Sequence, residues 1–225
     1  MPSKLSLQMP FITQIREQKR RPNRRNVYLD GKFAFGCNIN VIAKFRLREG
    51  LSLTADQVAQ ILTGEVRQEA FDYAMATLQR RLHSRAELQK KLAKREYQPA
   101  MIDEVLADLE RMGYVDDARF AKTKALSAAQ YKHHGHRRAL MELKKAGVVD
   151  ATARKAIEDV YEPHDSLGVA RTLAQKQAPR LRKLDPVVAR RRLTGMLARR
   201  GFDYDIVRPV IDEVLGYGDE PGTTE

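Results

Sequence analysis

The chain has 225 residues, of which 41 are Lys or Arg and 29 are Asp or Glu, so its formal net charge is +12. A hydrophobic content of 43% is sufficient for a packed core, and the single cysteine, Cys37, excludes both an intrachain disulfide and a four-cysteine zinc site. The strong positive charge favours a polyanionic partner, without distinguishing DNA from RNA or an anionic membrane.

The positive charge is concentrated in two stretches of the chain. Residues 1–50 contain 11 basic and 3 acidic residues, and residues 166–200 contain ten basic residues and one acidic residue, Asp185. Charge that only improves solubility would be spread more evenly, so we interpret both stretches as binding surfaces. No apolar run approaches the roughly 18 residues of a membrane span, and residues 1–10 do not resemble a signal peptide. We therefore expect a cytoplasmic protein.

The first predicted elements are short β-strands. Residues 26–29 and 32–35 are apolar runs on either side of Asp30-Gly31, and this dipeptide is typical of a tight hairpin turn because both central positions need positive φ. At a period of two, one face of the hairpin would carry Val27, Leu29, Phe33 and Phe35. The sequence therefore predicts a small antiparallel meander.

Two short helices are predicted after the meander. The first covers residues 40–49 and ends at a glycine. The second begins at Thr54, which forms a capping box with Gln57, and runs toward Leu62. Because glycine weakens a helix interior, we expect Gly64 to interrupt this second helix.

From about residue 65 onward the pattern is helical and repetitive. Offsets of 51 and 54 residues align Leu92 with Leu143 and Leu197, and the same register aligns Glu96 with Gly147 and Gly201. Each unit is predicted to contain three helices: 68–82, 84–95 and 99–112 in the first, 117–132, 135–146 and 150–161 in the second, and 165–181, 185–200 and 203–215 in the third. Repeats of this size bury their apolar faces against one another.

The predicted fold is mainly α, with tandem three-helix repeats in an elongated curved array that follows a small N-terminal β-meander with short helices. The expected domains are an N-terminal hairpin and helix domain (1–63), three repeats (64–113, 114–163 and 164–217) and a disordered tail (218–225). The tail is rich in Gly, Pro and acidic residues, which is a composition typical of disorder at a chain end.

Two segments resemble the RecX family of recombination regulators. Residues 113–121, GYVDDARFA, are similar to that family's G-[YF]-[IL]-[DN]-D-x-x-[FY]-A signature. Residues 132–147, KHHGHRRALMELKKAG, are similar to its K-x-x-G-x-x-x-[IL]-x-x-E-L-x-x-[KR]-G segment, although Ala146 stands where a basic residue is usual. The resemblance covers roughly residues 65–215, with a weaker similarity in the N-terminal meander.

The resemblance implies a regulator without enzymatic activity that acts in DNA repair, recombination and the SOS response. Its expected partners are the RecA filament, within whose helical groove it would bind, and single- and double-stranded DNA. The expected effects are limited filament growth and suppressed RecA ATP hydrolysis and strand exchange. No cofactor is implied, and we expect a monomer.

Two polar motifs that could suggest metal binding are more simply explained by helix capping and a helix start. Asp116-Asp117 follows the glycine that ends one predicted helix, so its oxygens are expected to cap the next helix rather than bind a metal. The cluster His133-His134-Gly135-His136 lacks a supporting carboxylate or thiolate, and a helix starting at Gly135 would separate the rings. We expect no metal there, although protonated rings would add positive charge at mildly acidic pH.

The candidate binding residues come from three basic clusters. The cations of the meander could bind a polyanion, or they could form a solvated strand edge that prevents aggregation. Those of the second and third repeats flank apolar positions on helices, and arginine suits phosphates and carboxylates alike. The candidates for DNA or RecA-filament binding are Arg20, Arg21, Arg24, Arg25, Lys132, Arg137, Arg138, Lys144, Lys145, Arg190, Arg191 and Arg192.

Two other functions are compatible with the residues alone. A stand-alone nucleic-acid-binding regulator would explain the charge, but the tandem units lack an obvious single recognition helix. A metal-dependent nuclease would need acids from several repeats to converge. Against catalysis, the sequence has no P-loop, no G-x-S-x-G and no H-E-x-x-H motif.

Overall fold

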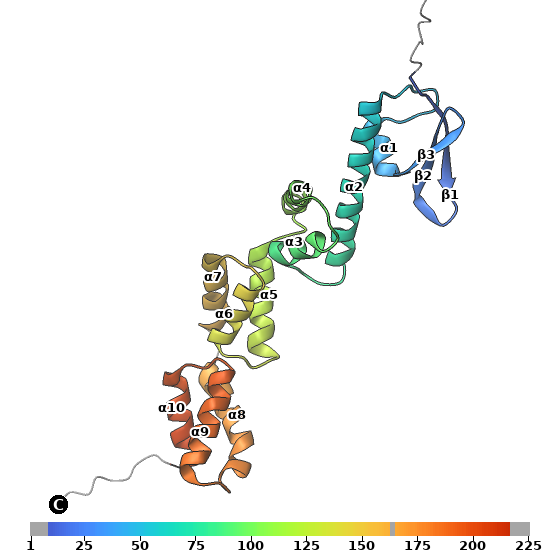
Figure 1. Cartoon of the computed structure of the whole chain (residues 1–225). Helices are drawn as coiled ribbons and strands as arrows, with labels where there is room; N and C mark the ends of the chain where they lie inside the picture. Colours follow the sequence, from blue (N-terminus) through green and yellow to red (C-terminus); the bar gives the residue numbers. More distant parts are fainter. Residues whose placement is uncertain (1–8, 163–164, 217–225) are drawn as a thin grey trace, which may run out of the picture. The chain divides into compact units, whose positions relative to one another are not determined.

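The computed structural model describes residues 9–162 and 165–216. Within these ranges three strands precede ten helices, so the prediction of a mainly α fold after an N-terminal antiparallel sheet is confirmed (Figure 1). The elements are β1 (Ile12–Gln18), β2 (Arg21–Leu29), β3 (Lys32–Asn38), α1 (Ile39–Phe45), α2 (Ala55–Leu78), α3 (Arg85–Ala93), α4 (Pro99–Arg111), α5 (Asp117–Gln130), α6 (His136–Lys145), α7 (Asp150–Tyr161), α8 (Ser166–Leu181), α9 (Pro186–Arg199) and α10 (Tyr204–Leu215).

The described residues form two compact units. One contains the residues up to 81 together with 92–108, and the other contains 82–91 together with the residues from 109 onward. The predicted tail, 218–225, lies outside the described residues. No helix in the described ranges is both long enough and apolar enough to cross a membrane.

The N-terminal sheet has the strand order β1-β2-β3, and both pairs are antiparallel. The predicted hairpin turn is confirmed, because Asp30 and Gly31 have φ values of 48° and 79°. Val27 pairs with Phe35 and both are buried, but Phe33 is 59% exposed. The prediction that Phe33 joins the buried face is therefore wrong: the register shifts between Val27 and Tyr28, and Phe33 lies beside the turn with its ring edge on Tyr28.

Helix α2 is continuous from Ala55 to Leu78, so the predicted interruption at Gly64 is wrong. Its start is as predicted, with a complete capping box between Thr54 and Gln57. A Cβ at Gly64 would lie 2.9 Å from Cε2 of Phe45 on α1. The glycine thus permits close packing of α1 while its backbone remains helical, and the predicted boundary after residue 63 falls inside this helix.

A buried ion pair joins the sheet to α2. Glu65 on α2 is only 7% exposed. Its Oε1 lies 2.7 Å from Nη1 of Arg24 on β2, and its Oε2 accepts a hydrogen bond from the backbone N–H of Asn38 at 2.7 Å. Burial, reinforced by the charge of Glu65 and a hydrogen bond to it, raises the pKa of Cys37 to about 12. The only thiol of the chain therefore stays protonated and unreactive at neutral pH.

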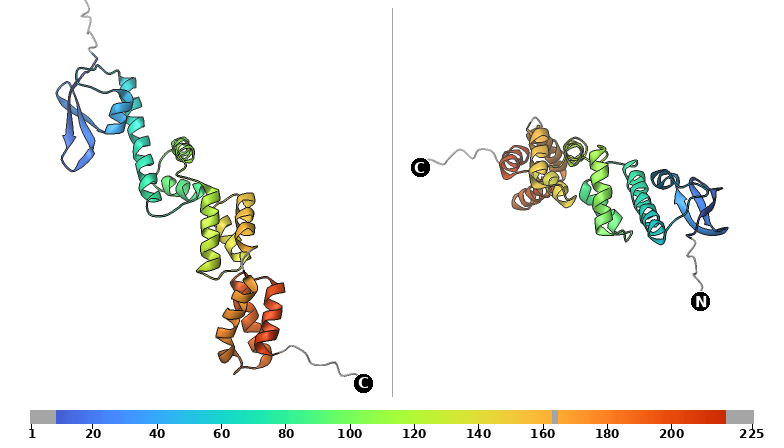
Figure 2. Two further views of the ribbon diagram at one scale, coloured as in Figure 1. Left: turned by 180° about the vertical axis from the view of Figure 1, so that it is seen from behind. Right: turned by 90° about the horizontal axis from the view of Figure 1, so that it is seen from above.

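Helices α5, α6 and α7 pack around one core and helices α8, α9 and α10 around another, as the three views of Figures 1 and 2 show. Leu143 in the first core and Leu197 in the second are fully buried and occupy equivalent places in the predicted register. The prediction that Asp116 caps a helix is confirmed, since its Oδ1 accepts from the backbone N–H groups of Ala118 and Arg119 at 2.9 Å.

Consecutive repeats contact each other through their middle helices, which are α3, α6 and α9. The C-terminal end of the later middle helix contacts the N-terminal end of the earlier one. At the start of α3, the Ser84 hydroxyl donates to the carbonyl of Ala146 at 2.6 Å. At the start of α6, the Gly135 N–H donates to the carbonyl of Arg200 at 2.8 Å. Ala146 and Arg200 are 54 residues apart, so both junctions use equivalent positions.

The aligned glycines of the second and third repeats are required by these junctions. Gly147 and Gly201 have φ values of 78° and 87°. A Cβ on Gly147 would lie 2.3 Å from the Cβ of Ala86, and one on Gly201 would lie 2.4 Å from the backbone N of Arg138. Glu96, at the same register in the first repeat, also has positive φ, 63°, but no earlier three-helix repeat precedes it in the chain.

Replacing Gly201 by alanine should therefore destabilise the third repeat by more than backbone strain alone. A non-glycine residue in the left-handed region costs about 1–3 kcal/mol, and the new methyl group would also collide with Arg138. The matched control is Gly216→Ala, because Gly216 has φ 81° and no atom within 4 Å of its added Cβ. Thermal unfolding should show a clearly larger loss for Gly201→Ala, and equal losses would contradict the close junction.

Candidate functional site

The four candidate arginines of the meander have different surroundings. Arg20 and Arg21 lie at the β1–β2 turn, are exposed and form no ion pair with a described residue. Arg25 lies 3.5 Å from Glu17 and donates to the carbonyl of Pro22 at 2.6 Å. Nη1 of Arg24 lies 2.7 Å from Oε1 of the buried Glu65 and 3.1 Å from Oε1 of Glu69. The charge of Arg24 is therefore neutralised within the protein.

Most candidate cations of the second repeat are engaged in contacts inside the protein. Arg137 pairs with Asp203, and Arg138 donates to the carbonyl of Arg199 at 3.0 Å, so both contact the third repeat. Lys132 pairs with Glu142 at 3.4 Å, and Lys144 pairs with Asp150 at 2.5 Å.

The side chain of Lys145, by contrast, is exposed and forms no ion pair within the described part of the chain. The candidates of α6 therefore mainly hold neighbouring elements in place, and Lys145 is the one whose charge is uncompensated.

Helix α9 presents its arginines to two different surroundings. Arg190 pairs with Asp212 on α10 at 2.7 Å, so its charge is neutralised within the repeat. Arg191, Arg192 and Arg199 are exposed, and among residues 9–162 and 165–216 none of them has an acidic partner. Arg192 and Arg199 are seven residues apart, which places them two turns apart on one side of the helix.

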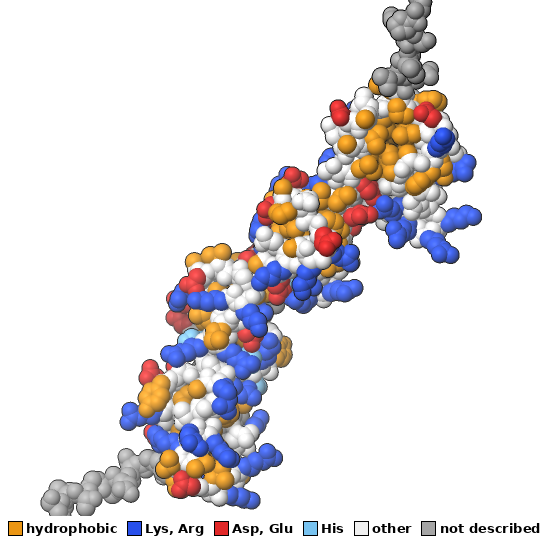
Figure 3. Space-filling model, viewed as in Figure 1, with side chains coloured by type: hydrophobic (Ala, Val, Ile, Leu, Met, Phe, Trp, Pro, Cys, Tyr) orange, Lys and Arg blue, Asp and Glu red, His pale blue; other side chains and the backbone are white. Residues whose placement is uncertain are grey.

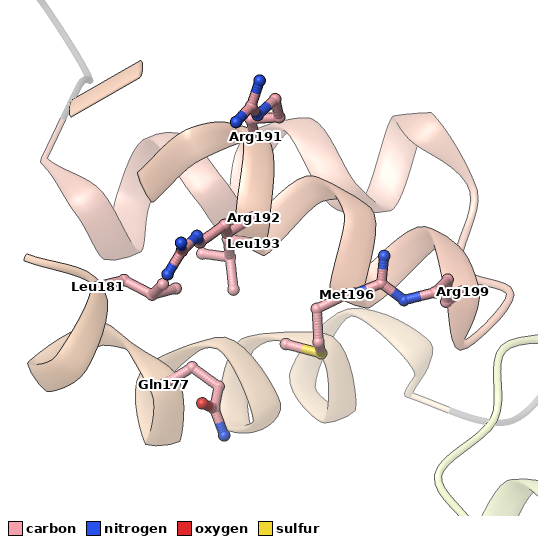
Figure 4. Close-up of a pocket in the computed structure, with 7 residues that line it drawn as sticks. All are labelled: Gln177, Leu181, Arg191, Arg192, Leu193, Met196 and Arg199. Atoms are coloured by element: carbon pink, nitrogen blue, oxygen red, sulfur yellow. The ribbon is translucent and has the colours of Figure 1, made fainter. Parts of the chain in front are cut away.

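An open cavity of about 410 Å³ lies between α8 and α9 (Figure 4). Leu181, Leu193 and Met196 supply its apolar lining, and Arg192 and Arg199 lie at its two ends along α9. Arg191 also borders the cavity but extends away from it in this view. The cavity therefore combines an apolar floor with two uncompensated guanidinium groups.

A second cavity of about 600 Å³ adjoins it at the junction of the second and third repeats. Its lining includes Arg138, Met141 and Lys145 from α6 and Phe202 after α9, together with one acid, Glu142, and Met141 is 70% exposed. Arg199 lines both cavities, so their mainly basic and apolar linings meet at this residue. We call this the α6–α9 surface: Arg138, Met141, Lys145, Leu181, Arg192, Leu193, Met196, Arg199 and Phe202.

The repeat register relates the cations of this surface to one another. An offset of 54 residues places Arg192 at the position of Arg138 and Arg199 at the position of Lys145. The space-filling view shows Lys and Arg side chains gathered over the second and third repeats (Figure 3). The two middle helices thus carry basic groups at equivalent places, which suits a ligand with repeated negative charges.

The three histidines diverge, as the helix start at Gly135 predicts. His134 lies 3.2 Å from Glu142, and His136 lies 3.2 Å from Asp203. Burial and then the charge of Arg138 lower the pKa of His134, although Glu142 opposes this shift. The lowered pKa means that His134 gains its proton at a lower pH than an unperturbed histidine, which opposes the expected gain of positive charge by this ring at mildly acidic pH. Within the described ranges no group of three His, Cys, Asp or Glu residues is arranged to hold a metal.

The apolar part of the α6–α9 surface was not predicted from sequence. Leu181 and Met196 come from different helices, and nothing local distinguishes them from core residues. Arg199 is not among the candidates predicted from sequence, although its seven-residue spacing from Arg192 is a signal that the two arginines share a helix side.

Models of the RecX family match three separate parts of the chain. The RecX N-terminal domain matches residues 10–54, the first three-helix domain matches 70–109, and the third three-helix domain matches 165–211. The last of these contains α9 and most of the α6–α9 surface's arginines.

The chain is also similar to curated proteins and solved structures. It is 29% identical over 94% of its length to the regulatory protein RecX of Bacillus subtilis, covering 80% of that protein. It is 30% identical over 94% of its length to the regulatory protein RecX of Leuconostoc mesenteroides, covering 79%.

A crystal structure of regulatory protein RecX shares the fold with a TM-score of 0.77, at 24% identity, over 90% of this chain and 99% of that one. A crystal structure of RecX from Lactobacillus salivarius has a TM-score of 0.58, at 22% identity, over 66% of this chain and 96% of that one. The domain models, the relatives and the shared fold agree: the chain belongs to the RecX family of regulatory proteins.

Proposed function

We propose that this protein regulates RecA by binding the RecA nucleoprotein filament, with contacts to both RecA and DNA, in the cytoplasm. It limits filament growth and suppresses RecA ATP hydrolysis and strand exchange during recombination and repair. The observation that carries the proposal is membership of a regulatory family together with the uncompensated arginines of α9. The protein acts by binding and needs no cofactor.

Several weak contacts on one chain act together in this binding. Arg20 and Arg21 of the meander and the α6–α9 surface belong to different parts of one chain, and each offers exposed positive charge. A nucleoprotein filament repeats its negative groups along its length, so several such contacts form at once. Each bound contact raises the effective concentration of the next, so the linked affinity exceeds that of any single contact.

The test is DNA-dependent ATP hydrolysis by RecA on single-stranded DNA. Substoichiometric protein should suppress hydrolysis. Arg192→Glu with Arg199→Glu should raise the concentration needed for half suppression by about tenfold or more, since each charge-assisted contact contributes about 1.5–3 kcal/mol. Arg137 and Arg138 are unsuitable for this purpose because they contact the third repeat.

The matched control carries the same charge change elsewhere. Lys155→Glu on α7 with Arg208→Glu on α10 alters two exposed cations that do not line the two cavities. This variant should suppress hydrolysis as the unmodified protein does, with circular dichroism confirming that both variants fold. No effect of the unmodified protein on RecA would eliminate the proposal and leave a stand-alone nucleic-acid-binding regulator as the alternative.

A further inference from the structure

We propose that the cavity between α8 and α9 receives one unstacked base of a single-stranded nucleic acid, whose phosphates lie against Arg192 and Arg199. The inference rests on the proposed function and names the ligand at this surface. Two features of the cavity carry it: the charge at its ends and the apolar character of its floor.

The charge of the cavity selects a polyanion. Helices α8 and α9 lie within the stretch 166–200, whose ten basic residues face a single acidic residue, Asp185, and the cavity lining contains no acid. Other arginines of this repeat have internal acidic partners, with Arg171 at 2.9 Å from Glu213 and Arg190 at 2.7 Å from Asp212. Arg192 and Arg199 are left for an external anion, and a guanidinium group binds phosphate oxygens through two hydrogen bonds.

The floor of the cavity selects single-stranded ligand. Phosphates alone would need only charge, yet Leu181, Leu193 and Met196 line the space between the two arginines. In a duplex the base faces are stacked on one another and cannot reach such a floor. An unpaired base can turn its face onto Met196 and Leu181, and the arginine planes offer further stacking.

The position of Arg199 extends the path of the strand. Because Arg199 also lines the junction cavity, a strand that leaves the first cavity continues past Arg199 toward Met141 and Lys145, which line the junction cavity with one acid, Glu142. The equivalent register of Arg138 with Arg192 and of Lys145 with Arg199 places basic side chains at the same spacing along both middle helices, although Arg138 also donates to the carbonyl of Arg199. A strand with regularly spaced phosphates fits that repetition better than an isolated anion does.

The test measures binding of the full chain, without RecA, by fluorescence anisotropy. The probes are an oligothymidylate of about 20 nucleotides, an abasic sugar-phosphate strand of the same length, a duplex of the same length and an oligoglutamate competitor. The abasic strand and the duplex should each bind about tenfold more weakly than oligothymidylate, because base contacts of this kind change affinity by about that factor. Oligoglutamate should compete poorly.

Three variants assign the contacts. Arg192→Gln with Arg199→Gln should reduce the slope of the log–log salt dependence by about 1.4, since each phosphate contributes about 0.7 on a single strand. Arg182 donates to the carbonyl of Val214 at 2.7 Å and does not line the cavity. The control Arg171→Gln with Arg182→Gln, which has the same charge change in the same repeat, should leave the slope unchanged. Met196→Gln should remove the preference for oligothymidylate over the abasic strand.

Equal binding of the oligothymidylate and abasic strands by the unmodified protein would overturn the base site, and this comparison does not depend on any variant folding. Equally strong competition by oligoglutamate would overturn it in favour of an acidic protein segment. If the two strands bind equally while the protein still suppresses RecA ATP hydrolysis, only the base site is wrong and the proposed regulation stands. Strand binding without any effect on RecA would remove the proposed regulation and leave the base site standing.

Discussion

Replacing Arg24 by methionine should lower the free energy of unfolding of the N-terminal domain by about 3–5 kcal/mol, because it leaves the buried carboxylate of Glu65 without its partner. Glu65 is 7% exposed and its distance to Arg24 is 2.7 Å, so water cannot replace the lost guanidinium group. Thermal unfolding followed by circular dichroism, with hydrogen exchange of the β2 and α2 amides, measures the loss.

The control separates a missing partner from a missing side chain. Arg24→Met with Glu65→Leu removes both charges together and should recover much of the stability, since an apolar pair of similar volume often replaces a buried ion pair without loss. Arg21→Met, three residues earlier on the same strand, should change stability by less than about 0.5 kcal/mol because Arg21 is exposed. If Arg24→Met kept full stability and lost only DNA affinity, Arg24 would be a binding residue rather than a structural one.

Replacing Leu143 by alanine should destabilise the second repeat by about 2–5 kcal/mol. Leu143 is fully buried among the side chains of α5, α6 and α7, and the hydrogen bonds at both ends of α6 limit how far the surrounding residues can close the resulting cavity. Since α6 also contacts the third repeat through Gly135 and Arg137, helix loss should extend to α8–α10. Thermal unfolding and hydrogen exchange of α9 amides measure both effects.

Met141→Ala is the matched control, because Met141 lies on the same helix and is 70% exposed. It should change the free energy of unfolding by less than about 0.5 kcal/mol. An unchanged melting profile for Leu143→Ala would show that the packing register of α6 differs from the one described.

The sequence by itself determined the starts of α2 and α5 and the register of the second and third repeats, because these depend on interactions between residues a few positions apart. Thr54 and Gln57 cap α2, and Asp116 caps α5 through backbone groups two and three residues away. The alignment of Leu143 with Leu197 likewise follows from helical periodicity and places both in buried positions. The motifs in residues 113–121 and 132–147 then identified the family.

The tertiary structure alone decided which cations are free to bind a partner. Arg24 and Arg21 are near neighbours of the same residue type, yet only Arg24 meets acids, and these lie 41 and 45 residues further along the chain. Arg190 and Arg192 differ in the same way, because Asp212 reaches Arg190 from another helix. Composition and local spacing report how much charge a segment carries, but its neutralisation depends on distant acids that only folding brings within hydrogen-bonding distance.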